Sequence, residues 1–251
     1  MKRVSILSLC LLFLSAAPIW GEDPSSSSMT VWFEDFSRKV LDPKTWRIAR
    51  SGDFKESKAA VINIAPAGQS PDHRLRLRAD TLGTNDRTVK FLGVRRVQPM
   101  DFKEGIAVSV DLDWNNQTNG SYLTAAVYLC PTSTGKNPQD EADWIRFEYV
   151  GVPPGQNARA TVATKVKGLV RWLYMEGWPD ENRTGRKIGL QHLVLRIDTN
   201  GFSLLENETE LYQTDAHGLG FNEAYLYLQM SSHSNYPARE IFFDNISVRS
   251  F

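Results

Sequence analysis

Residues 106–113 have the sequence IAVSVDLD, and this stretch shows the pattern that decides the fold class. Its apolar residues occupy every second position, and Ser109, Asp111 and Asp113 stand between them. Successive side chains of a β-strand point to opposite faces, so the alternation predicts a strand with one face in a core and the other in solvent. An amphipathic helix would instead need apolar residues three and four positions apart.

The same period of two recurs along most of the chain. Further runs of strand length occupy residues 122–129, 144–149, 192–198, 202–206, 225–230 and 240–248. Segments rich in Gly, Pro, Asn and Asp separate them, and residues 199–201 read Thr-Asn-Gly, a hairpin signal. We therefore expect an all-β domain of more than ten strands, folded as a two-sheet antiparallel jelly-roll β-sandwich.

The N-terminus has the features of a secretory signal peptide. Lys2 and Arg3 precede an apolar run over residues 4–14, and small residues follow. This order predicts a signal peptide over residues 1–21, a flexible leader over 22–30 and one β-sandwich domain over 31–251. The protein is then expected to be secreted, or periplasmic or otherwise extracellular.

Composition narrows the expected partners. The chain has 29 Lys and Arg residues and 29 Asp and Glu residues, so its net charge gives no reason to expect a nucleic-acid partner. No second apolar segment reaches membrane length, so no membrane insertion of the mature chain is expected.

Cys130 is the one cysteine outside the predicted signal peptide. An intramolecular disulfide is excluded for that mature chain, which must rely on its hydrophobic core.

Three segments in a fixed order carry a resemblance to a known superfamily. Residues 31–37 read VWFEDFS and precede LDPKTW at 41–46, HRLRLR at 73–78 leads into KFLGVR at 90–95, and EIFFDNISV occupies 240–248. This order resembles the concanavalin A-like lectin/glucanase superfamily. The resemblance implies a jelly-roll body whose last strand lies beside the first. It does not imply one activity, because the fold hosts lectins, glucanases and polysaccharide lyases.

The resemblance also implies a place for a structural calcium ion. In members of the superfamily a calcium ion often ties the first strand to the last, and the candidate ligands here are Glu34 or Asp35 together with Asp244, plus backbone carbonyl oxygens. Calcium takes hard oxygen ligands and tolerates irregular geometry. The alternative is that these carboxylates cap strand ends and contact solvent.

The glucanase branch carries a Glu-x-Asp-x-x-Glu strand, which places two carboxylates on one sheet face, as a retaining glycosidase requires. That motif is absent here: Asp111 and Asp113 lack the third acid. Glu148 would partner them only if the strands were neighbours. A lyase would need a Tyr or His base and Arg or Gln to neutralise a uronate. Tyr227 and His233 offer the base, which completes the set of catalytic candidates.

The main hypothesis is binding rather than catalysis. Three rows combine aromatic and planar polar residues: Ser109/Asp111/Asp113, Trp144/Arg146/Glu148 and Tyr227/Gln229/Ser231/His233. If all three lie on one concave sheet face, they would form a groove for an extracellular polysaccharide. The expected ligand-binding residues are Arg146, Trp144, Trp178, Gln229 and His233, with Trp178 in an exposed loop. The alternatives are a glycoside hydrolase or polysaccharide lyase of this fold, and a surface adhesion or scaffold domain with a protein partner.

Overall fold

A computed structural model describes residues 30–50, 60–67, 71–83, 89–114, 123–134, 137–151, 159–176, 189–233 and 235–251. The predicted signal peptide, the first eight residues of the predicted leader and Trp178 lie outside these ranges. Thr30, the last residue of the predicted leader, begins the first strand. Among the described residues, no helix is long and apolar enough to cross a membrane.

The prediction of an all-β fold is confirmed. The described strands are β1 (Thr30–Glu34), β2 (Trp46–Arg50), β3 (Ala60–Pro66), β4 (His73–Ala79), β5 (Val89–Arg96), β6 (Met100–Asp101), β7 (Ile106–Asp113), β8 (Leu123–Cys130), β9 (Trp144–Val150), β10 (Arg159–Val166), β11 (Leu169–Met175), β12 (Leu190–Ile197), β13 (Phe202–Glu206), β14 (Thr209–Thr214), β15 (Glu223–His233) and β16 (Arg239–Ser250). A short 3-10 helix, η2 (Pro138–Asp140), lies between β8 and β9.

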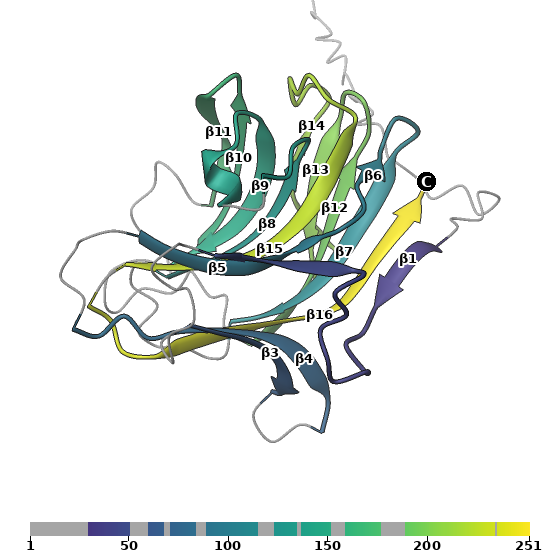
Figure 1. Ribbon diagram of the computed structural model, residues 1–251. Helices are drawn as coiled ribbons and strands as arrows, with labels where there is room; N and C mark the ends of the chain where they lie inside the picture. The colour runs from purple at the N-terminus through teal and green to yellow at the C-terminus, as the bar shows by residue number, and fades with distance from the viewer. Residues whose placement is uncertain are drawn as a thin grey trace, which may run out of the picture.

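The strands form two antiparallel sheets, as predicted (Figure 1). Sheet A has the order β14-β13-β12-β7-β16-β4-β3, and β1 pairs with β16 beside it. Sheet B has the order β11-β10-β9-β8-β15-β5-β2, and β6 pairs with the start of β15. The first described strand therefore lies beside the last, with Glu34 opposite Ile246, as the superfamily resemblance implies.

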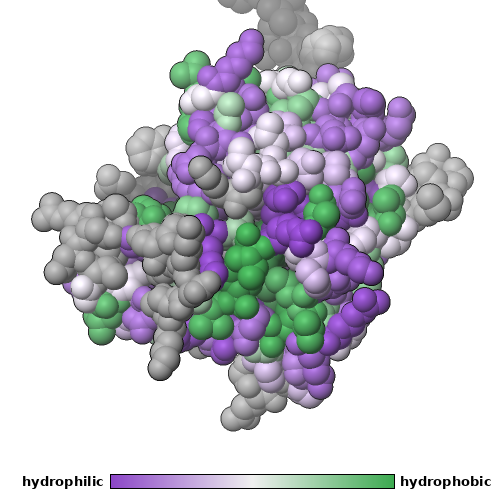
Figure 2. Space-filling model, viewed as in Figure 1, coloured by the Kyte–Doolittle hydropathy of each residue, from purple (hydrophilic) through white to green (hydrophobic). Residues whose placement is uncertain are grey.

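The hydrophobic core lies between the two sheets. In β7 the burial alternates along the strand as the sequence predicts, and Val108, Val110 and Leu112 are fully buried. They pack in one cluster with residues of sheet B such as Val127 and Phe147. Figure 2 shows apolar residues gathered near the middle of this side of the molecule, between β5 and β16 as placed in Figure 1, with polar residues around them.

Sheet B contains one position where only glycine fits. A Cβ atom on Gly93 of β5 would lie 2.2 Å from the carbonyl oxygen of Leu228 on β15. A backbone oxygen cannot move aside as a flexible side chain would, so the absence of a side chain lets β5 and β15 pair closely. This pairing positions the face of sheet B described next.

Candidate functional site on the outer face of sheet B

Sheet B carries a second cluster of buried side chains, separate from the main core. It contains Ala49, Ala126, Tyr128, Cys130, Trp144, Ala163 and Tyr227, with Tyr225 packed against it. The residues next to them in the strands, such as Val127, Ile145 and Leu226, belong to the core between the sheets. Because side chains alternate along a strand, the second cluster lies on the face of sheet B that points away from sheet A.

Strand register aligns this face into a continuous row, which we call the arginine row. It runs across seven strands in the order Arg47, Arg95, Tyr227, Tyr128, Arg146, Ala163 and Trp172. Directly opposed residues of antiparallel strands have Cβ atoms about 4.5–5.5 Å apart. The row therefore brings two predicted site residues, Arg146 and Tyr227, to either side of Tyr128.

The next row along the strands, which we call the glutamine row, is built mostly of small residues. Its order is Ala49, Gly93, Gln229, Ala126, Glu148 and Thr161. Gln229 and Glu148 are its two long side chains, and both are buried. In the two rows of described residues, Glu148 is the only carboxylate.

Aromatic rings surround the guanidinium group of Arg146. Its Cζ atom lies 5.0 Å from the ring centroid of Trp144, 5.2 Å from that of Trp172 and 5.9 Å from that of Tyr128. Nη1 donates a hydrogen bond of 3.2 Å to the Tyr128 hydroxyl. Cation–π attraction and this hydrogen bond fix the guanidinium in one position. Trp172 remains 47% exposed, so it brings an aromatic surface to solvent above a buried cation.

Glu148 is held by Arg146 and by its neighbour on β10. Its Oε1 lies 2.7 Å from Arg146 Nη2 and accepts a hydrogen bond of 3.4 Å from Thr161 Oγ1. Burial raises the pKa of the Glu148 carboxyl, against the opposing attraction of Arg146 and the hydrogen bond from Thr161. A carboxyl group with a raised pKa can retain its proton and act as an acid.

Five buried polar atoms in these two rows and on the neighbouring Trp144 have no hydrogen-bond partner among the described residues. They are Arg95 Nε, Trp144 Nε1, Arg146 Nε, Tyr227 Oη and Gln229 Oε1. Buried polar atoms are rarely left without a partner, because each costs about 1–3 kcal/mol. Burial also raises the pKa of Tyr227, so its hydroxyl keeps a proton to donate. Five such atoms on one sheet face indicate a place where a polar ligand supplies the missing bonds.

The structure joins two of the three predicted polar rows and separates the third. Trp144, Arg146 and Glu148 share the outer face of sheet B with the row of Tyr227, Gln229 and His233, although His233 lies at the far end of β15. Ser109, Asp111 and Asp113 lie on β7 in the other sheet. The prediction of one groove made by all three rows is therefore wrong. Trp178 lies outside the described residues.

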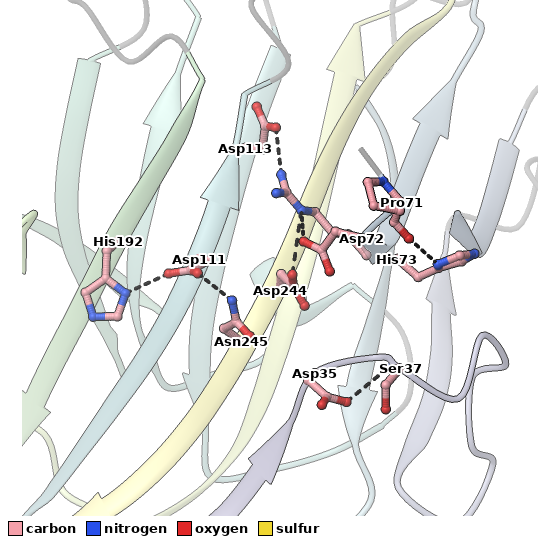
Figure 3. Close-up of polar contacts among 11 residues, drawn as sticks. Asp35, Ser37, Pro71, Asp72, His73, Asp111, Asp113, His192, Asp244 and Asn245 are labelled. Atoms are coloured by element: carbon pink, nitrogen blue, oxygen red, sulfur yellow. Dashed lines mark hydrogen bonds and ion pairs between the residues drawn. The ribbon is translucent and has the colours of Figure 1, made fainter. Parts of the chain in front are cut away.

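Asp111 and Asp113 belong to a polar network on the outer face of sheet A (Figure 3). Asp111 lies 2.6 Å from His192 Nδ1 and accepts a hydrogen bond of 2.9 Å from Asn245 Nδ2. Asp113 accepts a hydrogen bond of 3.0 Å from Arg74 Nη1. Because β7 pairs with β12 and β16 and not with β9, neither aspartate can partner Glu148.

The three acids predicted to bind calcium each contact other residues of the chain. Glu34 accepts hydrogen bonds from Phe36 N and from Trp46 Nε1, and Asp35 accepts one from Ser37 N. Asp244 lies 3.6 Å from Arg74, whose positive charge is unfavourable beside a metal ion. Among the described residues, no group of three or more His, Cys, Asp or Glu side chains could hold a metal ion. The predicted site combines two acids with backbone carbonyl oxygens, so calcium binding at these residues stays a prediction.

Two residues of the arginine row carry no sequence signal that would assign them to this site. Tyr128 lies in a nearly continuous apolar run, in which the alternation that separates the two faces is lost. Arg95 lies beside Arg96, and the sequence does not show which of the two faces outward. Their places become visible only when the pairing of β5, β15 and β8 is known.

No known family matches the sequence of the chain, and no curated protein matches it either. Solved structures match its fold. The laminarinase catalytic domain from Thermotoga maritima has a TM-score of 0.59 and 13% identity, covering 89% of this chain and 98% of that one. A β-1,3-1,4-glucanase (lichenase) derived from a mouse hindgut metagenome has a TM-score of 0.59 and 10% identity, covering 88% and 99%. The globular domain of T. cruzi calreticulin has a TM-score of 0.55 and 13% identity, covering 89% and 88%.

These similarities define the class of the fold. The chain has the concanavalin A-like jelly-roll fold, as the sequence resemblance implies. Identity this low establishes the fold and not the activity, and the same fold is found in glucanases and in calreticulin. The function of this chain must therefore be argued from its own side chains.

Proposed function

We propose that the protein binds a polysaccharide on the outer face of sheet B. The observation that carries this proposal is a set of five buried polar atoms without partners, four in the two adjacent rows and one on the neighbouring Trp144, placed among aromatic rings. Sugars offer hydroxyl groups to such atoms and apolar ring faces to aromatic side chains. Adjacent strands lie about 4.8 Å apart, so the row from Arg95 on β5 to Trp172 on β11 extends about 24 Å. A row of that length suits a polymer better than a single sugar.

The first candidate for its activity is a polysaccharide-degrading enzyme, a glycoside hydrolase or polysaccharide lyase. Several solved structures that share the fold are laminarinases and glucanases, so the fold itself is compatible with such chemistry. On this chain, Glu148 offers a carboxyl group whose burial raises its pKa, as a general acid requires. For β-elimination, the outer face instead offers Tyr227, with Gln229 and Arg146 to neutralise a uronate carboxylate.

The second candidate is a protein that binds the polysaccharide without cleaving it. Hydrolysis of a glycosidic bond ordinarily uses two carboxyl groups, about 5–9 Å apart. Glu148 is the only carboxylate in the two described rows, and Arg146 holds it in an ion pair of 2.7 Å. This observation favours binding alone. Export to the cell exterior, where polysaccharides occur, is part of either proposal and is supported by the signal-peptide pattern of residues 1–21.

One set of assays on the purified protein would distinguish a polysaccharide-degrading enzyme from a protein that only binds the polysaccharide. Co-sedimentation with insoluble polysaccharides and affinity electrophoresis with soluble ones would measure binding. Release of reducing ends and the absorbance of unsaturated uronates would measure hydrolysis and elimination. We expect binding to at least one polysaccharide. Failure to bind any would reject the site, and binding without product would select the second candidate.

Substitution tests the role of Glu148 directly. If the protein is a hydrolase, Glu148→Gln should abolish product release and retain binding, because the amide keeps the size and acceptor of the carboxyl but cannot deliver its proton. Glu210→Gln is the matched control, since Glu210 is exposed on β14 of sheet A. Full activity in Glu148→Gln would remove Glu148 from the chemistry.

A further inference from the structure

We infer that the polysaccharide bound by sheet B is anionic, and that Arg95, Arg47 and Tyr227 bind its acid groups. This inference rests on the proposed function and specifies its ligand. It concerns the end of the arginine row formed by β2, β5 and β15, away from Glu148.

The unpartnered atoms of this face are mostly donors. Arg95 Nε, Arg146 Nε and Trp144 Nε1 carry hydrogens and accept none, and the Tyr227 hydroxyl keeps its proton. Gln229 Oε1 can only accept, and the Tyr227 hydroxyl can both donate and accept. A neutral sugar hydroxyl both donates and accepts, whereas a carboxylate or sulfate oxygen only accepts. Since three of the five atoms can only donate and one can only accept, the set matches a ligand that bears anionic oxygens.

The charges along the arginine row also favour an anionic ligand. Arg47 and Arg95 are direct cross-strand partners, and like charges in that position repel each other. Among the described residues, no carboxylate forms an ion pair with either guanidinium group. Arg47 donates to the carbonyl oxygen of Pro43 at 2.8 Å, and Arg95 donates to that of Arg96 at 3.3 Å. An anion placed between the two arginines would turn their repulsion into shared attraction.

Arg95 and Tyr227 complete the geometry of an anion site. They are also direct cross-strand partners, so the two unpartnered donors, Arg95 Nε and Tyr227 Oη, lie side by side on one face. Stacking over the Tyr225 ring, at 5.0 Å from Cζ to centroid, fixes the guanidinium of Arg95. At the other end of the site the charge of Arg146 is already balanced by Glu148. The acid group of the ligand therefore belongs at Arg95 rather than at Arg146.

The test uses one sugar backbone in three chemical forms, namely dextran, carboxymethyl-dextran and dextran sulfate, together with alginate, carrageenan and neutral laminarin. Affinity electrophoresis of the full protein should show retention by anionic polymers and little by neutral ones. The carboxylated and sulfated arms distinguish the two kinds of acid group. Retention should weaken as salt is added, because screening reduces the attraction between ligand and arginine.

Two variants connect the binding to the proposed residues. Arg95→Gln should weaken binding of the retained anionic polymer about tenfold or more, since it removes a charge-assisted hydrogen bond. Arg47 is exposed, so Arg47→Gln should fold normally and weaken binding by a smaller factor. Arg249→Gln removes the same charge from an exposed position of sheet A and should leave binding unchanged.

The outcomes separate this inference from the proposed function. Binding to laminarin or dextran at least as tight as to the anionic polymers would overturn the inference and leave the proposed function standing. Unchanged binding in both Arg95→Gln and Arg47→Gln would also overturn it. Binding to none of the polymers would overturn the inference and the proposed function together.

Discussion

The outer faces of the two sheets both carry arginines and carboxylates, but their polar groups are satisfied differently. On sheet A, Arg74 lies within 3.0–3.6 Å of three carboxylates, those of Asp72, Asp113 and Asp244, which are labelled in Figure 3. One buried polar atom of this cluster, Asp244 Oδ1, has no hydrogen-bond partner among the described residues. On sheet B, Arg146 contacts one carboxylate, and five buried polar atoms have no partner among the described residues. The comparison teaches that a polar sheet face is not by itself a site. Most polar groups on sheet A contact one another, whereas sheet B has several buried polar atoms that a ligand could contact.

The largest effect on stability is expected at Arg146. Arg146→Met would leave Glu148 buried without its ion-pair partner, so the free energy of unfolding should fall by about 3–5 kcal/mol. The double variant Arg146→Met with Glu148→Gln removes both charges and should recover part of that loss. Denaturant titration of the two variants measures the difference. A loss below about 1 kcal/mol in the single variant would show that the pair is no more important than a surface ion pair.

Gly93 tests whether the close pairing of β5 and β15 is required. Gly93→Ala would place a Cβ atom 2.2 Å from the Leu228 carbonyl oxygen, so one of the two strands must shift. Overpacking of this kind should cost about 1–3 kcal/mol in the free energy of unfolding. Gly220→Ala is the control, because a Cβ atom there meets nothing within 4 Å. Equal stability of the two variants would contradict the tight fit.

Sheet A should contribute a pH dependence of stability through Asp244. Burial, together with the nearby charge of Asp72, raises the pKa of Asp244 from its ordinary value of 3.8 to about 7, although a backbone hydrogen bond from Asn245 and the charge of Arg74 act to lower it. The folded state then binds a proton more tightly than the unfolded chain does. Stability from this group is present below about pH 4 and is lost as pH rises towards 7, by at most about 1.4 kcal/mol per pH unit.

Asp244→Asn should remove that part of the pH profile, because an amide does not titrate. Unfolding free energies measured from pH 4 to pH 8 would show a flatter profile in the variant. Asp101→Asn, on the exposed side of β6, is the control and should follow the unsubstituted protein. A profile of unchanged slope in Asp244→Asn would show that Asp244 does not carry this pH dependence.

The fold could be predicted from sequence because its signals are local. Alternation in residues 106–113 shows which side chains of β7 are buried, and this follows from the geometry of a single strand. The site depends instead on which strands pair. Nothing near Asp111 in the sequence shows that β7 lies in sheet A, and nothing near Arg95 shows that it opposes Arg47 and Tyr227. Strand pairing joins residues more than a hundred positions apart, as between Arg95 and Tyr227. The predicted rows on β9 and β15 do share one sheet, but the prediction added a third row, on β7, that lies in the other sheet.

The smallest effect is expected at Trp172, the one residue of the arginine row that is both aromatic and well exposed. Its cation–π contact with Arg146 is partly open to solvent, so Trp172→Ala should lower the free energy of unfolding by about 1 kcal/mol or less. Its effect on polysaccharide binding should be several-fold, because the ring offers a flat apolar surface to a sugar. Leu169→Ala is the control on the same strand, since Leu169 is 78% exposed and lies outside the row. If the two variants bind equally well, the ligand does not extend to β11, and the site is confined to the strands from β5 to β9.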